Sequence, residues 1–211
     1  MSAAAIYLHG ALMVFAWQVL APLCIFIARY LKVRRGQDFP RVADNPFWWR
    51  WHWIGQSVAV AVSTIGLIVI WHQRGEIVTD HWHARIGAFV VIAGWLQVLG
   101  GLLRGTKGGP TGVGADPADP RTWRGDHYDM TPHRQTFEGV HKGMGYAAVI
   151  AAPLAVWLGL EMAGAEPWLA WSSLGLSFVF AATMAAGEAA GWRVPTYRAI
   201  WGHDFGGRPP S

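Results

Sequence analysis

Long apolar segments alternate with polar connections along the 211-residue chain, and five of these segments stand out. A helix that spans a bilayer needs roughly 20 mostly apolar residues, and each segment reaches that length. The pattern therefore predicts an all-α, integral membrane helical bundle of about five transmembrane helices. The predicted spans are about Ile6–Leu31, His52–Trp71, Trp82–Leu103, Gly139–Leu160 and Trp168–Ala190.

The connections divide the predicted bundle into two parts. Residues 1–161 form a four-helix membrane core, interrupted by a polar loop at about 104–136 that is rich in Gly, Pro and Asp. Residues 162–211 hold the fifth transmembrane helix and a polar tail. Because the fifth helix contains no histidine, we expect it to support the other four.

Positive charge is strongly biased to one side of the predicted membrane. That side holds 15 of the 17 Lys and Arg residues, and the other side holds only Arg74 and Arg85. The positive-inside rule places the crowded side in the cytoplasm. We therefore expect an integral protein of a bacterial inner membrane, in contact with membrane lipid, with a periplasmic N-terminus and a cytoplasmic C-terminus.

Composition agrees with the membrane interpretation and narrows the chemistry. Charged residues make up 14% of the chain and hydrophobic residues 53%, whereas about 25% of a soluble domain is charged. The single cysteine, Cys24, excludes an internal disulfide and covalent haem attachment through Cys-x-x-Cys-His. The net charge of +4 does not by itself indicate nucleic-acid binding, because the placement of positive residues matters more in a membrane protein, and we expect no nucleic-acid partner.

Four of the nine histidines lie singly on four of the predicted spans: His9, His52, His83 and His141. Polar residues inside a span are costly and usually functional. One such histidine alone could equally be a packing residue that makes a hydrogen bond. Four of them, one on each helix, make that interpretation much weaker.

Depth restricts how these histidines can pair. His9 and His83 lie near the outer starts of their helices, whereas His52 and His141 lie near the inner starts of theirs. In an up-and-down bundle the first and third helices are diagonal across the core, as are the second and fourth. We therefore expect an outer pair of His9 with His83 and an inner pair of His52 with His141.

Two imidazoles that face each other across a bundle suit the axial positions of a six-coordinate haem iron. Zinc would require a third or fourth ligand nearby. The predicted cofactors are therefore two haem b groups, with irons on the order of 20 Å apart. Gly87 and Gly145, each four residues after a histidine, would leave room for a flat macrocycle.

Several further residues are weaker candidates. Arg134 and Lys142 flank His141 and are candidates for binding haem propionates or an anionic donor. Gln56 lies one turn after His52, where it would contact a haem edge or simply pack. Glu138, one helical turn before His141, could accept a proton or orient a neighbour, although a solvated interfacial carboxylate is the favoured interpretation. His81 is an alternative to His83 as the outer ligand.

These residues resemble the cytochrome b561 family, especially the membrane part of its DOMON-linked members. The resemblance covers roughly residues 5–160 and implies a di-haem protein that passes electrons across a membrane, often from ascorbate. It also implies that His9, His52, His83 and His141 are the haem ligands. The matching motifs are His9-Gly-Ala-Leu-Met13, Ala28-Arg-Tyr-Leu31, Trp51-His52 with Gln56, His83 with Gly87, and Arg134 with Phe137 and His141-x-x-x-Gly145.

The sequence also departs from the family pattern. The usual core has one more helix before the first histidine-bearing span, a DOMON domain is missing from this sequence, and the 104–136 connection is longer. The donor therefore stays open between ascorbate, a quinol, another small reductant and a protein, and the acceptor is unassigned. By analogy, a periplasmic redox partner would replace the DOMON domain.

The leading hypothesis is a di-haem b-type cytochrome that performs transmembrane one-electron transfer. One alternative is a quinol- or superoxide-linked b-type cytochrome of similar build. A different class is a non-redox membrane anchor or assembly subunit that recruits a partner through the 104–136 loop, and another is a haem or metal transporter. The last two predict that no haem pair is tightly bound.

Overall fold

The computed structural model describes residues 2–34, 36–37, 46–76, 79–104, 114–116, 118–122 and 132–194, apart from the side chains of residues 120 and 132–135. All regular structure within these residues is helical. Five helical segments are long and apolar enough to cross a membrane, which confirms the predicted all-α class and the five spans.

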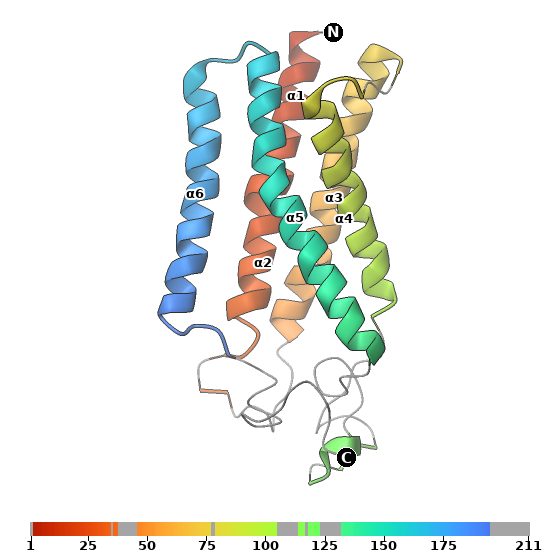
Figure 1. The fold of residues 1–211 in the computed structure, drawn as a ribbon, viewed down its shortest axis with the longest axis vertical. Helices are drawn as coiled ribbons and strands as arrows, with labels where there is room; N and C mark the ends of the chain where they lie inside the picture. The colour runs from red at the N-terminus through yellow and green to blue at the C-terminus, as the bar shows by residue number, and fades with distance from the viewer. Residues whose placement is uncertain are drawn as a thin grey trace.

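The elements follow the chain in the order shown in Figure 1. The first span consists of α1, a π-helical segment η1, and α2, and each later span is one helix. A short 3₁₀ turn, η2, lies in the long connection. The bounds are α1 Ala3–Val14, η1 Phe15–Leu20, α2 Ala21–Tyr30, α3 Pro46–Arg74, α4 Trp82–Leu102, η2 Pro120–Thr122, α5 Pro132–Met162 and α6 Pro167–Ala189.

Two helices begin earlier than the apolar pattern predicts. α3 starts six residues before His52, and α5 starts seven residues before Gly139. Each begins at a proline, a residue that suits the first helical turn because the missing N–H would have no partner there. The hydropathy pattern detects only the part of each helix that fits within lipid, so the Trp-rich inner end of α3 and the polar inner end of α5 were not predicted.

The first span departs from a regular α-helix at its centre. The wider π-helical turns of η1 end two residues before Pro22. A proline inside a helix cannot donate to the carbonyl four residues earlier, and its ring clashes with that carbonyl. A π-helical segment is one way to accommodate this defect, and such segments are frequent at functional sites.

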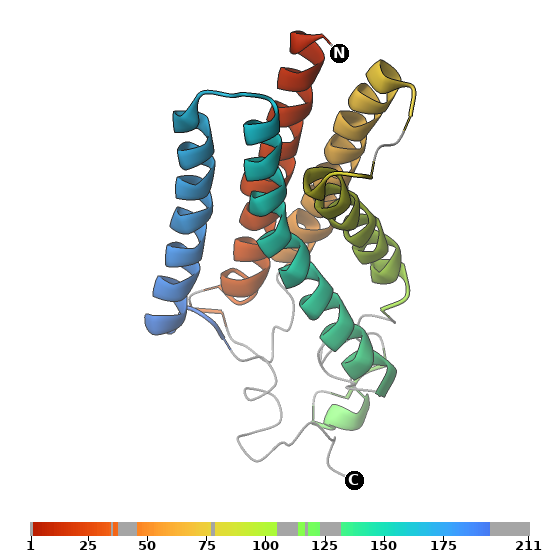
Figure 2. The same ribbon diagram turned by 45° about the horizontal axis from the view of Figure 1, so that its top comes forward.

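The helices pack in the ring order expected of an up-and-down bundle. The first span packs against α3, α3 against α4, α4 against α5, and α5 back against the first span. α6 packs outside this ring against α5 and the first span. Figures 1 and 2 show α6 at one edge of the bundle beside α5, with α3 and α4 at the opposite edge.

A buried apolar layer fills the centre of the four-helix ring. Trp17 is its largest residue, and it packs against small or branched side chains. Gly94 makes room for it, because a Cβ there would lie 2.9 Å from Val60 and 3.0 Å from the Trp17 ring. The buried members of this central layer are Ala16, Trp17, Ala21, Ala59, Val60, Val90, Ala93, Ala148 and Ala152.

Polar contacts attach α6 to the first span, as expected of a supporting helix. The buried amide of Gln18 donates to the Ser173 hydroxyl over 2.7 Å. Near the inner end, Arg29 pairs with Glu188 at 2.7 Å, and the Tyr30 hydroxyl donates to the Met184 carbonyl over 2.7 Å. Such bonds are useful in lipid, where the hydrophobic effect does not hold helices together.

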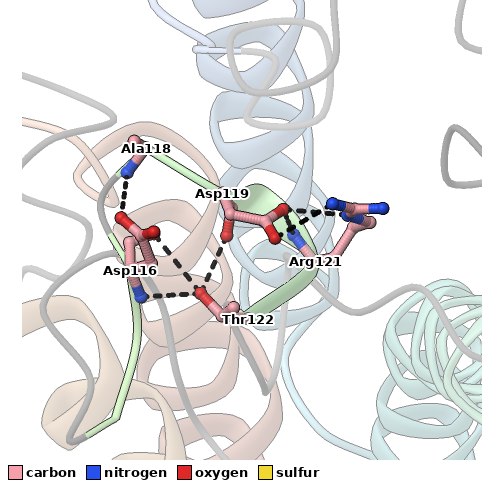
Figure 3. A network of polar contacts seen from close by, with 5 residues as sticks. All are labelled: Asp116, Ala118, Asp119, Arg121 and Thr122. Carbon is pink, nitrogen blue, oxygen red and sulfur yellow. Dashed lines mark hydrogen bonds and ion pairs between the residues drawn. The ribbon is translucent and has the colours of Figure 1, made fainter.

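The described part of the long connection forms a turn closed by its own side chains (Figure 3). The backbone N–H of Asp116 donates to the Thr122 hydroxyl over 2.7 Å, and Arg121 donates to the Asp119 carboxylate over 3.0 Å. The Arg121 guanidinium therefore holds the pKa of Asp119 below its usual value. Asp and Thr side chains commonly stabilise turns in this way.

Candidate functional site

The outer histidines face each other across the bundle. His9 on α1 and His83 on α4 have ring centres 6.0 Å apart, with ring planes at 80°. Both side chains are partly buried. Metal–imidazole bonds of about 2.0 Å, plus about 1.1 Å from each nitrogen to its ring centre, place two imidazoles on one iron with centres about 6.2 Å apart. The observed spacing matches that value.

Each outer histidine is oriented by a carbonyl on a neighbouring helix. Nδ1 of His9 lies 2.9 Å from the Gly66 carbonyl oxygen, and Nδ1 of His83 lies 2.8 Å from that of Ala155. Because a carbonyl only accepts, both Nδ1 atoms must carry the hydrogen. In a neutral ring, Nε2 then holds the free lone pair, and this arrangement is typical of metal-ligating histidines.

Two glycines make this close approach possible. A Cβ on Gly159 would lie 2.7 Å from Cε1 and 2.8 Å from Nδ1 of His83. A Cβ on Gly66 would lie 3.2 Å from the Met13 methyl and 3.7 Å from Nδ1 of His9. The backbones of α5 and α3 can therefore approach the two rings and present carbonyls to them.

The inner histidines form a second pair of the same spacing. His52 on α3 and His141 on α5 have ring centres 6.1 Å apart, with ring planes at 69°. Nδ1 of His52 makes no hydrogen bond within the described residues. The inner pair thus reproduces the ring spacing of the outer pair.

Aromatic rings and cations surround the inner pair. Phe137 stacks on His141 with ring centres 5.1 Å apart, and Trp48 lies 6.5 Å from His52. The Lys32 ammonium lies 4.6 Å from the centre of the Trp48 ring. On the same side of the bundle, the Arg104 guanidinium lies 3.5 Å from the Trp49 ring centre. The inner face is therefore both aromatic and positively charged.

The donor set fits a haem better than a bare metal ion. Within the described part of the chain, no three His, Cys, Asp or Glu side chains gather closely enough to hold a metal. A protein-bound zinc needs three or four protein ligands. A haem brings its own equatorial nitrogens and requires only axial ligands from the protein. Two opposed imidazoles at each end of the bundle satisfy that requirement.

The structure distinguishes His83 from His81 as the histidine that faces His9. His81 precedes the first residue of α4, its side chain is exposed, and its Nε2 lies 3.3 Å from the Asp80 carboxylate. His72 is also exposed, at the outer end of α3. Of the three, His83 is the residue that the fold brings to His9.

The weaker candidates have other partners. Gln56 donates to the Ala21 carbonyl over 3.0 Å and so ties α3 to the first span. Lys142 pairs with Glu138 at 2.5 Å, one helical turn away. Glu138 is only 8% exposed, so its interpretation as a solvated carboxylate was wrong. The ion pair with Lys142 compensates the buried carboxylate for its loss of solvent. The side chain of Arg134 lies outside the described residues.

The sequence prediction missed some residues of the site. Gln97 on α4 donates to the His141 carbonyl. A Cβ on Gly145 would lie 2.8 Å from Nε2 of Gln97, so that glycine accommodates an amide. Gly87 faces open space within the described structure, as a macrocycle would require. An amide inside a transmembrane span is a signal that could have identified Gln97.

Two known proteins are similar to this chain, and both are ferric-chelate reductases by name. The chain is 26% identical to ferric-chelate reductase 1 of Bos taurus over 174 residues, which is 79% of this chain and 25% of that protein. It is 31% identical to a putative ferric-chelate reductase 1 homolog of Drosophila melanogaster over 99 residues, 47% of this chain and 15% of that protein. The chain thus spans at most a quarter of these relatives.

The other comparisons add no relatives. No protein-family model matches the chain, and no solved structure matches it. The aligned region of the bovine relative is long enough to include most of the helical bundle.

Proposed function

We propose that this protein is a b561-like di-haem b-type cytochrome that transfers single electrons across a membrane. The observation that carries the proposal is the pair of opposed imidazoles at each end of the bundle, with ring centres 6.0 and 6.1 Å apart. The similarity to ferric-chelate reductases supports it independently. The resemblance to the cytochrome b561 family leads to the same four histidines.

The four histidines would hold two haem b groups as axial ligands. His9 and His83 would bind the outer one, and His52 and His141 the inner one. When bound, haem supplies reversible one-electron iron chemistry. The carbonyls of Gly66 and Ala155 hold the outer rings in one tautomer and raise their basicity as ligands.

The central layer separates the two sites. On each of the four helices it begins seven residues beyond the histidine, at Ala16, Ala59, Val90 and Ala148. At about 1.5 Å per residue, the layer lies about 11 Å from each pair. Its side chains exclude water and charge, so protons and ions are blocked while electrons can tunnel between the two sites.

The inner face suits an anionic or polar donor. Lys32 and Arg104 lie over the aromatic side chains there, and clustered positive charge attracts anions. We propose ascorbate, a quinol or a protein as the donor. The names of the relatives point to a ferric chelate as one acceptor, and a periplasmic redox partner is another. The orientation, N-terminus outward in a bacterial inner membrane, rests on the positive-inside rule.

Electron transfer can be measured directly in liposomes that enclose ferricyanide and face ascorbate outside. We expect the purified, haem-loaded protein to bleach the trapped ferricyanide at least about 10-fold faster than protein-free liposomes, because neither ion crosses lipid readily. His83→Ala and His141→Ala should each return the rate to background. The exposed His72 provides the matched control, since His72→Ala should leave the rate unchanged. Wild-type protein that matches empty liposomes would refute the proposal.

A further inference from the structure

A cavity of about 400 Å³ lies between the first span, α5 and α6, on the side of the bundle where α6 stands in Figure 1. None of the four paired histidines lines it. Ligand pockets in proteins typically measure about 300–1,000 Å³ and combine apolar walls with a few polar groups. This cavity has that composition.

One residue of the cavity wall has a buried hydrogen-bond donor without a partner. Trp17 lines the cavity and is only 5% exposed, and its indole N–H has no hydrogen-bond partner within the described residues. A buried donor without an acceptor is costly, and each such group requires an explanation. An oxygen of a bound molecule would supply the missing acceptor.

Further polar groups line the same cavity. Gln18 and Ser177 contribute an amide and a hydroxyl, which lie 3.3 Å apart. The Tyr146 hydroxyl accepts from Arg29 over 3.0 Å, while no described residue accepts its own O–H. Arg29 in turn pairs with Glu188. A chain of polar groups therefore connects the cavity with the inner end of α6.

The backbone around the cavity is irregular on two of its three sides. The π-helical segment η1 contributes Trp17 and Gln18. Pro153 interrupts the hydrogen bonding of α5 and also lines the cavity. The wall beside it includes Ile150 and Tyr146, which are 75% and 43% exposed. In a bilayer these exposed side chains face lipid, so a ligand would enter from the membrane.

We propose that this cavity binds the ring of a membrane-soluble quinone. A quinone ring is flat and apolar and carries two carbonyl oxygens, which can accept from donors such as the Trp17 N–H and the Tyr146 O–H. A saturated acyl chain offers no acceptor to these groups, and a soluble anion does not reach a lipid-facing opening. The site rests on the cavity and not on the haem ligands.

The test uses the full chain in lipid nanodiscs with decylubiquinone as the probe and palmitate as the acyl-chain comparison. We expect saturable binding of decylubiquinone above its partition into empty nanodiscs, with palmitate unable to displace it. Ala181 lines the cavity and its neighbour Ala182 does not. Ala181→Leu should therefore abolish saturable binding, whereas Ala182→Leu should leave it unchanged.

A second variant tests the unsatisfied donor. Trp17→Phe keeps an aromatic ring and removes the N–H, so it should weaken binding about 2- to 10-fold, the effect of one hydrogen bond. Trp171→Phe, which changes an exposed ring outside the cavity, should have no effect. Non-saturable uptake, equal displacement by palmitate, or identical behaviour of the two alanine variants would overturn the proposal. Each of these outcomes can occur with both haems in place, so failure here differs from failure of the proposed function.

Discussion

Replacing His141 with alanine is expected to remove the inner haem and leave the outer one bound. The two pairs lie at opposite ends of the bundle, and the central layer separates them. Sites this far apart that share no side chain usually behave independently. The haem content of the purified variant should fall by half in a pyridine haemochrome assay. The absorption that remains should be that of the outer haem alone.

The complementary variants make this prediction specific. His83→Ala should remove the outer haem and spare the inner one, which gives the opposite residual spectrum. His81→Ala is the matched control, because His81 is exposed and lies two residues from His83. It should retain both haems. Equal loss of both haems in His141→Ala, at unchanged helical content, would contradict two separate sites.

Gly159→Val is expected to displace the outer haem although Gly159 is not itself a proposed haem ligand. Any Cβ at this position would lie within 2.8 Å of two atoms of the His83 ring. The ring would have to move, and its hydrogen bond to Ala155 would be lost with the movement. Overpacking of this kind typically costs about 1–3 kcal/mol. Haem content should fall towards one per chain, with the outer spectrum lost first.

Gly175→Val is the matched control for this variant. It also places valine in a transmembrane helix, and its Cβ would meet no atom within 4 Å. Both substitutions carry the same cost in helix propensity, so a difference between them reports contact with His83. Two haems in Gly159→Val with an unshifted spectrum would mean that His83 does not occupy the position described.

The transmembrane spans and the histidine pairs could be predicted from the sequence, because each depends on how deep the residues lie in the membrane. A run of apolar residues locates a helix in the membrane, and alternating direction decides which histidines share a level. For the same reason, the extensions of α3 and α5 at Pro46 and Pro132 were missed. They lie outside the predicted lipid-spanning part of each helix, in a Trp-rich segment of α3 and a polar segment of α5.

The contacts between side chains were much harder to predict from the sequence. The contact of Gly159 with His83 joins helices whose rotation about their own axes is set by packing along their full length. The burial of Glu138 depends on which face of α5 packs into the bundle, which composition does not reveal. The π-helical segment before Pro22 depends on how one proline is accommodated. These features follow from packing in three dimensions, so the linear pattern did not predict them.

The most direct test of the central claim is the number of haems bound to each purified chain. The protein should be expressed with ample haem, and the pyridine haemochrome assay should be combined with a reduced-minus-oxidised spectrum. Two opposed histidine pairs predict two b-type haems per chain, both reducible. A colourless preparation, or a content that stays at one haem after full loading, would contradict the assignment of His9, His52, His83 and His141 as two ligand pairs.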